Sequence, residues 1–108
     1  MNGLLALLVA VTGLHGVVMR GPTKPVCEVG TPCSEPAVGT TLAFSRAGRV
    51  VLRVKTGKGG RYAVHLAPGL YVVSVVPRQR IGGMKPTDVR VRRGVDARVN
   101  FAIDTGIR

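Results

Sequence analysis

The chain has 108 residues, of which 45% are hydrophobic, and a formal net charge of +11. This length excludes a multidomain protein, and the apolar content excludes a disordered chain. The charge suggests either a polyanionic partner or a solvated basic surface, while an aromatic content of only 4% argues against a nucleic-acid module that stacks bases.

The chain opens with an apolar, uncharged run, GLLALLVAVT, at residues 3–12. This run is too short to cross a bilayer as a helix, and it is similar to the apolar region of a secretory signal peptide. We therefore predict a signal peptide over residues 1–12 and a mature domain over residues 13–108. The basic leading region of such peptides is missing, which indicates a truncated or misassigned start. The alternative is that residues 4–11 form a buried strand or short helix.

A first strand is predicted at residues 14–20, followed by a Pro-rich loop at residues 23–36 that contains both cysteines, Cys27 and Cys33. In an oxidising compartment this pair is expected to form a disulfide, and so small a loop stabilises a fold by roughly 2–3 kcal/mol. Free thiols and a metal or redox pair are the alternatives. The spacing is not C-x-x-C, and no second ligand pair lies nearby.

The middle of the chain alternates polar and apolar residues, which is typical of strands with one buried face. The predicted strands span residues 38–44, 49–55, 61–66 and 70–73. Glycines at 57, 59 and 60 mark a flexible turn, and Pro68-Gly69 closes a hairpin between the last two strands.

After a polar loop at residues 77–86, two more strands are predicted at residues 87–92 and 95–103. The final strand has the cleanest alternation, with Val95, Val99 and Phe101 among the residues on its inner face. About seven strands separated by frequent turns, with no helical periodicity, predict an all-β, antiparallel Greek-key sandwich.

Five short motifs follow one another along this pattern. They are Leu14-x-Gly16-x-Val18, Pro36-x-Val38, Thr56, Gly60-Arg61-Tyr62 and Leu66-x-Pro68-Gly69-x-Tyr71-x-Val73. Their order and spacing resemble the carboxypeptidase regulatory-like domain, a member of the transthyretin-like (prealbumin-like) group of sandwiches, over residues 14–104. That family often has Asp after the Thr, where this chain has Gly57. The resemblance implies a non-catalytic accessory module of secreted or surface proteins.

No catalytic constellation is evident in the sequence. His15 and His65 lack the context of a zinc peptidase and are interpreted as solvated or edge-strand residues. Asp88, Asp96 and Asp104 fall on outward positions or at a strand end, and no serine has a G-x-S-x-G setting. The Gly-rich turns open no helix, so they are not phosphate loops. We therefore expect no enzymatic activity, no cofactor and no bound metal.

The basic residues remain as a candidate binding surface. Six of them are predicted on solvent-facing positions and would form a basic, polyanion-binding stripe if their strands were neighbours: Arg49, Arg53, Lys55, Arg90, Arg92 and Arg98. The leading hypothesis is a secreted, non-catalytic module with a structural or binding role at the bacterial cell surface. The alternatives are a protein that binds an anionic wall polymer, anionic lipid or nucleic acid, or a carbohydrate or small-ligand binder that uses its loop tips. No transmembrane helix and no specific nucleic-acid motif are predicted, and the oligomeric state is left open.

Overall fold

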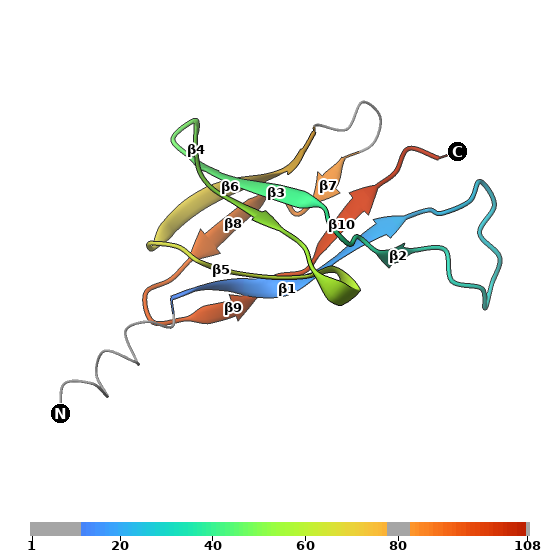
Figure 1. Ribbon diagram of the computed structural model, residues 1–108, viewed down its shortest axis with the longest axis horizontal. Helices are drawn as coiled ribbons and strands as arrows, with labels where there is room; N and C mark the ends of the chain where they lie inside the picture. The colour runs from blue at the N-terminus through green and yellow to red at the C-terminus, as the bar shows by residue number, and fades with distance from the viewer. Residues whose placement is uncertain (1–11, 78–82, 108) are drawn as a thin grey trace.

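The computed structural model describes residues 12–77 and 83–107 and shows two β-sheets packed face to face (Figure 1). The strands are β1 (Gly13–Gly21), β2 (Glu35–Pro36), β3 (Thr41–Arg46), β4 (Arg49–Lys55), β5 (Arg61–His65), β6 (Gly69–Val76), β7 (Met84–Lys85), β8 (Asp88–Val91), β9 (Asp96–Arg98) and β10 (Phe101–Asp104). A 3₁₀ turn, η1 (Lys58–Gly60), precedes β5. The predicted all-β sandwich is confirmed.

Each sheet has a simple strand order. The first sheet is antiparallel and runs β4-β3-β6-β8. The second is built around β1, whose first half pairs with β5 and β9 and whose second half pairs with β2 and β10; β7 lies beyond β10. The pairing of β1 with β9 and β10 is parallel, so the first and last strands of the domain lie side by side.

The core forms from the inward residues of both sheets, as the alternation predicts. In β5, Tyr62 and Val64 are buried between exposed neighbours, and β6 buries Tyr71 and Val73 in the same way. The largest fully buried side chains are Phe44, Phe101, Leu14, Leu42, Val18 and Val73. The ring of Tyr62 contacts both phenylalanine rings, with centroids 6.3 Å from Phe44 and 5.5 Å from Phe101. Because Phe44 belongs to the first sheet, this aromatic contact joins the two layers.

The predicted last strand is interrupted at Val99 and Asn100, which separate β9 from β10. The amide of Val99 donates to the carbonyl of His15 at 2.8 Å. The amide of Val17, however, donates to the side-chain Oδ1 of Asn100 at 2.9 Å. A Cβ on Gly16 would lie 2.1 Å from the carbonyl oxygen of Val99, so only glycine permits this close crossing.

The second predicted strand begins at Thr41, three residues later than expected. The cause is Thr56, a polar residue only 3% exposed, whose hydroxyl donates to the carbonyl of Ala37 and accepts from the amide of Thr40 at 2.9 Å. The Thr56 amide also donates to the Thr40 carbonyl at 2.8 Å. These bonds hold residues 37–40 in a turn. Two further differences are the short strands β2 and β7, which lie within the predicted loops.

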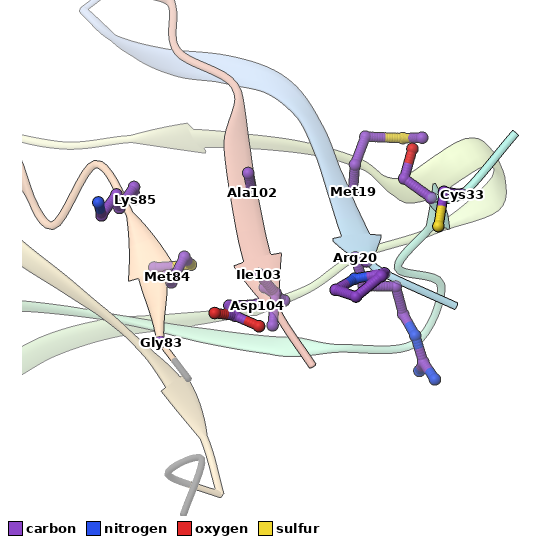
Figure 2. Close-up of a pocket in the computed structure, with 12 residues that line it drawn as sticks. Met19, Arg20, Cys33, Gly83, Met84, Lys85, Ala102, Ile103 and Asp104 are labelled. Carbon is purple, nitrogen blue, oxygen red and sulfur yellow. The ribbon is translucent and has the colours of Figure 1, made fainter. Parts of the chain in front are cut away.

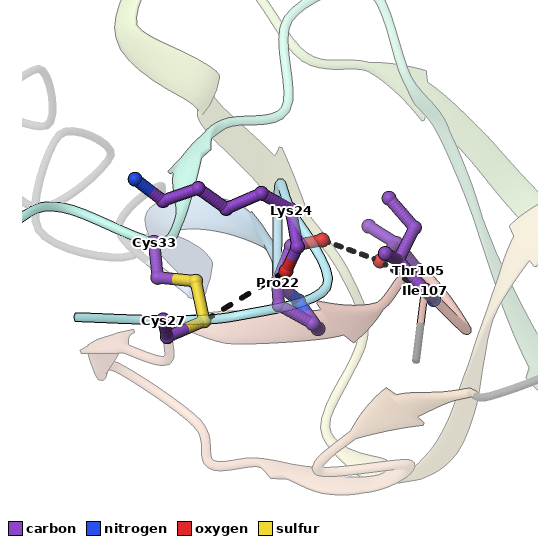
Figure 3. The surroundings of a disulfide bond; sticks show 6 residues. All are labelled: Pro22, Lys24, Cys27, Cys33, Thr105 and Ile107. Atoms are coloured by element: carbon purple, nitrogen blue, oxygen red, sulfur yellow. Dashed lines mark hydrogen bonds between the residues drawn. A yellow bond between two sulfur atoms is a disulfide. The ribbon is translucent and has the colours of Figure 1, made fainter.

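Cys27 and Cys33 form the predicted disulfide, with Cα atoms 5.6 Å apart (Figure 3). The loop that carries them extends away from the sandwich between β1 and β2 (Figure 1). At its base, the hydroxyl of Thr105 donates to the carbonyl of Pro22 at 2.7 Å, and the amide of Thr23 donates to the carbonyl of Cys33 at 2.9 Å. The loop is therefore fixed both within itself and to the C-terminal segment.

The predicted signal peptide, residues 1–12, lies outside the described residues except for Thr12, and it stays a prediction. Among the residues that the structure describes, none belongs to a helix with the length and apolar character needed to span a membrane.

Candidate active site

The outer face of β1, β5 and β9 carries an open groove of about 600 Å³. Its lining residues are His15, Gly16, Val17, Arg61, Tyr62, Ala63, Arg98 and Asn100. The strand register explains why these residues meet: His15 lies opposite Ala63 of β5 and Arg98 of β9. The outward side chains of three strands therefore share one surface.

A histidine–carboxylate pair lies at this groove. The Nδ1 atom of His15 is 3.0 Å from Oδ1 of Asp96, and both side chains remain partly exposed, at 37% and 42%. Asp96 lies opposite Gly13 in the parallel register of β1 and β9, two positions before Arg98, which lies opposite His15. An ionised carboxylate only accepts hydrogen bonds, so the Nδ1 atom carries a proton and donates it. In the neutral imidazole, Nε2 then holds the free lone pair and can act as a base.

Two arginines border the same groove. Arg98 lies directly opposite His15, and Arg61 lies opposite Val17, two residues further along β1. Neither guanidinium forms an ion pair or hydrogen bond with the described residues. Guanidinium groups bind carboxylate, phosphate and other oxyanions through paired N–H donors. The groove thus places two cationic donor groups beside a histidine base.

Beneath the groove, Tyr62 and Asn100 fix the strands that carry the site. The Tyr62 hydroxyl donates to the carbonyl of Val99 at 2.5 Å. Burial raises the pKa of Tyr62 well above its usual range, and the negative charge of Asp96 adds to this effect. Tyr62 is therefore neutral at physiological pH and acts as a donor to the segment between β9 and β10.

A second groove, of about 790 Å³, lies at the other end of the same sheet, between β1, β10 and β7 (Figure 2). Met19, Met84 and Ile103 give it apolar walls, and Lys85 lies at its edge. Arg20, which also lines it, is paired with Glu35 at 3.1 Å. Its described lining contains no histidine, and its cysteine, Cys33, is in the disulfide. This groove offers no histidine base and no free nucleophilic thiol, so we place the candidate chemistry at His15.

The six basic residues predicted as a polyanion site are distributed over both sheets. Arg49, Arg53 and Lys55 lie on β4, Arg90 lies on β8 and Arg92 follows it, and Arg98 lies on β9. Because β4 and β8 are the opposite edges of the first sheet, the condition for one continuous stripe is not met. Arg98 alone among the six joins the groove at His15. Within residues 12–77 and 83–107, no three His, Cys, Asp or Glu side chains gather in a way that could hold a metal ion.

The pairing of His15 with Asp96 was not predicted from the sequence. We interpreted His15 as a solvated or edge-strand residue and Asp96 as an outward position, and the two are 81 residues apart. One pattern in the sequence could have indicated this pairing. The alternation of the first and last strands places His15 and Asp96 on outward faces, and if these two strands pair, the two side chains lie on the same surface.

No protein-family model and no curated protein sequence match the chain. Among solved structures, it is similar to the 5-hydroxyisourate hydrolase of Klebsiella pneumoniae, at 20% sequence identity and a TM-score of 0.50, over 88% of this chain and 91% of that chain. This likeness confirms a transthyretin-like fold. The narrower assignment to carboxypeptidase regulatory-like domains stays a prediction.

The same comparison corrects the functional expectation. We took the fold to indicate a non-catalytic module and expected no enzymatic activity; that inference is wrong, because the matched structure of this fold is an enzyme. A scaffold does not determine whether a chain is catalytic, so function has to be argued from the site. For this chain, the site that can be argued is the groove at His15.

Proposed function

We propose that the chain is a hydrolase whose general base is His15, positioned by Asp96, and whose substrate is a small polar molecule that carries or develops negative charge. The observation that carries this proposal is the 3.0 Å contact between His15 Nδ1 and Asp96 Oδ1 at the edge of a groove bordered by two arginines. The similarity to a 5-hydroxyisourate hydrolase supports hydrolysis as the reaction class and supplies a first substrate to test.

The proposed reaction uses the groups in a definite order. Nε2 of His15 takes a proton from a water molecule as the water oxygen attacks a carbonyl carbon of the substrate. The imidazolium that forms is stabilised by the Asp96 carboxylate, and it returns the proton to the leaving nitrogen or oxygen as that bond breaks. Arg98 lies next to His15 and is placed to bind the negative charge that develops on the carbonyl oxygen.

The test is the loss of the ultraviolet absorbance of 5-hydroxyisourate, measured against the uncatalysed rate in buffer. A parallel panel of small cyclic amides and esters covers the wider substrate class. General-base catalysis is typically worth about 10²–10⁴ in rate, so we expect His15→Gln to lower kcat by at least 100-fold. Arg98→Gln is expected to lower kcat and kcat/KM together, because the charge that Arg98 binds develops only in the transition state. Arg90→Gln, the same change on the other sheet, is the control and should behave as wild type.

Asp96 is a positioning residue, and its test separates kcat from KM. Asp96→Asn retains the shape of the side chain but also offers an N–H donor, which favours the wrong tautomer of His15. We expect kcat to fall while KM stays within about twofold, since general-base catalysis but not substrate binding depends on this contact. Activity that survives in His15→Gln, or no hydrolysis of any member of the panel by the wild-type chain, would refute the proposed function.

We further propose that the protein is exported. The disulfide between Cys27 and Cys33 supports an oxidising compartment, and the apolar run at residues 3–12 supports a secretory signal. The mass of the protein recovered from outside the cytoplasm would reveal both cleavage near residue 12 and the loss of two thiol hydrogens. Recovery of the uncleaved, reduced chain from the cytoplasm alone would contradict export.

A further inference from the structure

Strand β4 leaves one side of the first sheet open. Among residues 12–77 and 83–107, it is the terminal strand of that sheet and pairs only with β3. In an antiparallel pair, alternate residues direct their amide and carbonyl groups away from the partner. The free side of β4 therefore presents unpaired backbone donors and acceptors, which another extended chain can use.

The charges around this edge are of one sign. Arg49, Arg53 and Lys55 are exposed on β4 itself. From residue 36 to residue 87 the sequence contains no Asp or Glu, so β3, β4, β5 and β6 carry no carboxylate. An edge whose charge is not balanced by its neighbouring strands attracts a partner of opposite charge.

The same strand also carries apolar contact area. Val50 and Val51 are 48% and 52% exposed, which is high for large aliphatic side chains in a strand. A β-bulge between Phe44 and Ser45 shifts the register opposite them. The edge therefore combines backbone hydrogen-bonding groups, apolar side chains and positive charge within seven residues.

These features disfavour a second copy of the chain as the occupant. In an antiparallel pairing of two β4 strands centred on Leu52, Arg49 of each copy would lie opposite Lys55 of the other. Like charges placed directly opposite one another destabilise strand pairing, and charged residues and bulges on an edge prevent such self-association. In an acidic partner strand, carboxylates would instead lie opposite Arg49 and Lys55, and these opposite charges would stabilise the pairing.

We propose that β4 binds an acidic, extended peptide segment of another protein by adding it as a further strand to the first sheet. Backbone hydrogen bonds along β4 supply the pairing, and the cations of β4 select a partner strand rich in Asp and Glu. This binding is independent of the groove at His15, because β4 and β9 belong to different sheets.

The test uses the full chain and a labelled seven-residue peptide of alternating glutamate and valine, with fluorescence anisotropy as the readout. Two peptides serve as controls: lysine in place of glutamate reverses the charge, and proline in place of valine keeps the charge but cannot pair as a strand. We expect the glutamate–valine peptide to bind at least tenfold more tightly than either control. Equal binding of the glutamate–proline peptide would overturn the proposal and indicate charge attraction alone.

Two matched variants localise the binding. Arg53→Glu should weaken binding of the glutamate–valine peptide at least tenfold at low salt, while Arg90→Glu, the same charge change at the opposite edge of the sheet, should change it less than threefold. Hydrogen exchange on the wild-type chain should show new protection of amides in β4. Equal losses in the two variants, or no added protection in β4, would refute strand addition. Competition by a single-stranded oligonucleotide that depends equally on both arginines would instead identify a general polyanion surface.

Discussion

Replacing Thr56 with valine removes one buried hydroxyl from a side chain of almost unchanged shape. The hydroxyl serves two backbone groups, because it accepts from the amide of Thr40 and donates to the carbonyl of Ala37. Ala37 is fully buried, so water cannot replace the partner of its carbonyl, and an unsatisfied buried group costs about 1–3 kcal/mol. The lost bond to the partly exposed Thr40 amide adds about 1 kcal/mol. We expect Thr56→Val to lower the free energy of unfolding by about 2–4 kcal/mol.

The assay is urea unfolding followed by circular dichroism, with a thermal melt as a second measurement. For a domain of this size, 1 kcal/mol corresponds to about 4–8 °C, so the melting temperature should fall by roughly 10–30 °C. Thr41→Val is the matched control, because the hydroxyl of Thr41 makes no hydrogen bond with the described residues and valine suits a strand. A loss below 1 kcal/mol for Thr56→Val, or an equal loss for both variants, would refute the assigned role of Thr56.

Three further predictions concern other parts of the fold. Gly16→Ala would place a Cβ 2.1 Å from the carbonyl oxygen of Val99. We therefore expect the free energy of unfolding, measured in urea, to fall by at least about 2 kcal/mol, and hydrolytic activity to be lost. A stable, active variant would contradict the close crossing of Gly16 and Val99. Folding raises the pKa of Tyr62 above its unfolded value of 10.0, so the unfolded state loses this proton first and stability falls as the pH rises above 10. Tyr62→Phe should reduce that fall relative to wild type, and identical pH profiles of unfolding would count against it. Replacing both Cys27 and Cys33 with serine should lower the free energy of unfolding by about 2 kcal/mol, because the disulfide closes a loop and so restricts the unfolded chain. An unchanged unfolding midpoint would show that the disulfide does not stabilise the domain.

The fold could be predicted from the sequence because its main signals are local. The alternation in residues 61–66 and 70–73 reports directly which side of a strand is buried, and Pro68-Gly69 marks the turn between them. The transthyretin-like resemblance rested on the spacing of these motifs. Parts of the fold that depend on contacts between distant residues could not be predicted in this way. The late start of β3 depends on Thr56, and the break between β9 and β10 depends on Asn100 and on β1.

The candidate active site was missed for the same physical reason. Each residue of the pair has an ordinary local context: His15 is a polar residue on an outward strand position, and so is Asp96. Their chemistry arises only from the parallel pairing of β1 with β9, which no local pattern reveals. The basic residues show the converse case, since their exposure was predictable from alternation, but their distribution over opposite sheet edges depended on the strand order.

The adjacency of β1 and the last strands also constrains how the protein is made. A ribosome releases β1 well before β9 and β10, so a nascent chain holds its central strand without two of its partners until residues 96–104 have emerged. Topologies dominated by such distant pairings fold slowly, because a long loop must close before any of its contacts stabilise the chain. His15 meets Asp96 only after the 81 further residues that separate them in sequence have been synthesised. A chain that ends before β9 would therefore lack both a closed sheet and the carboxylate that positions His15, and hydrolytic activity would report that β9 has been synthesised and folded against β1.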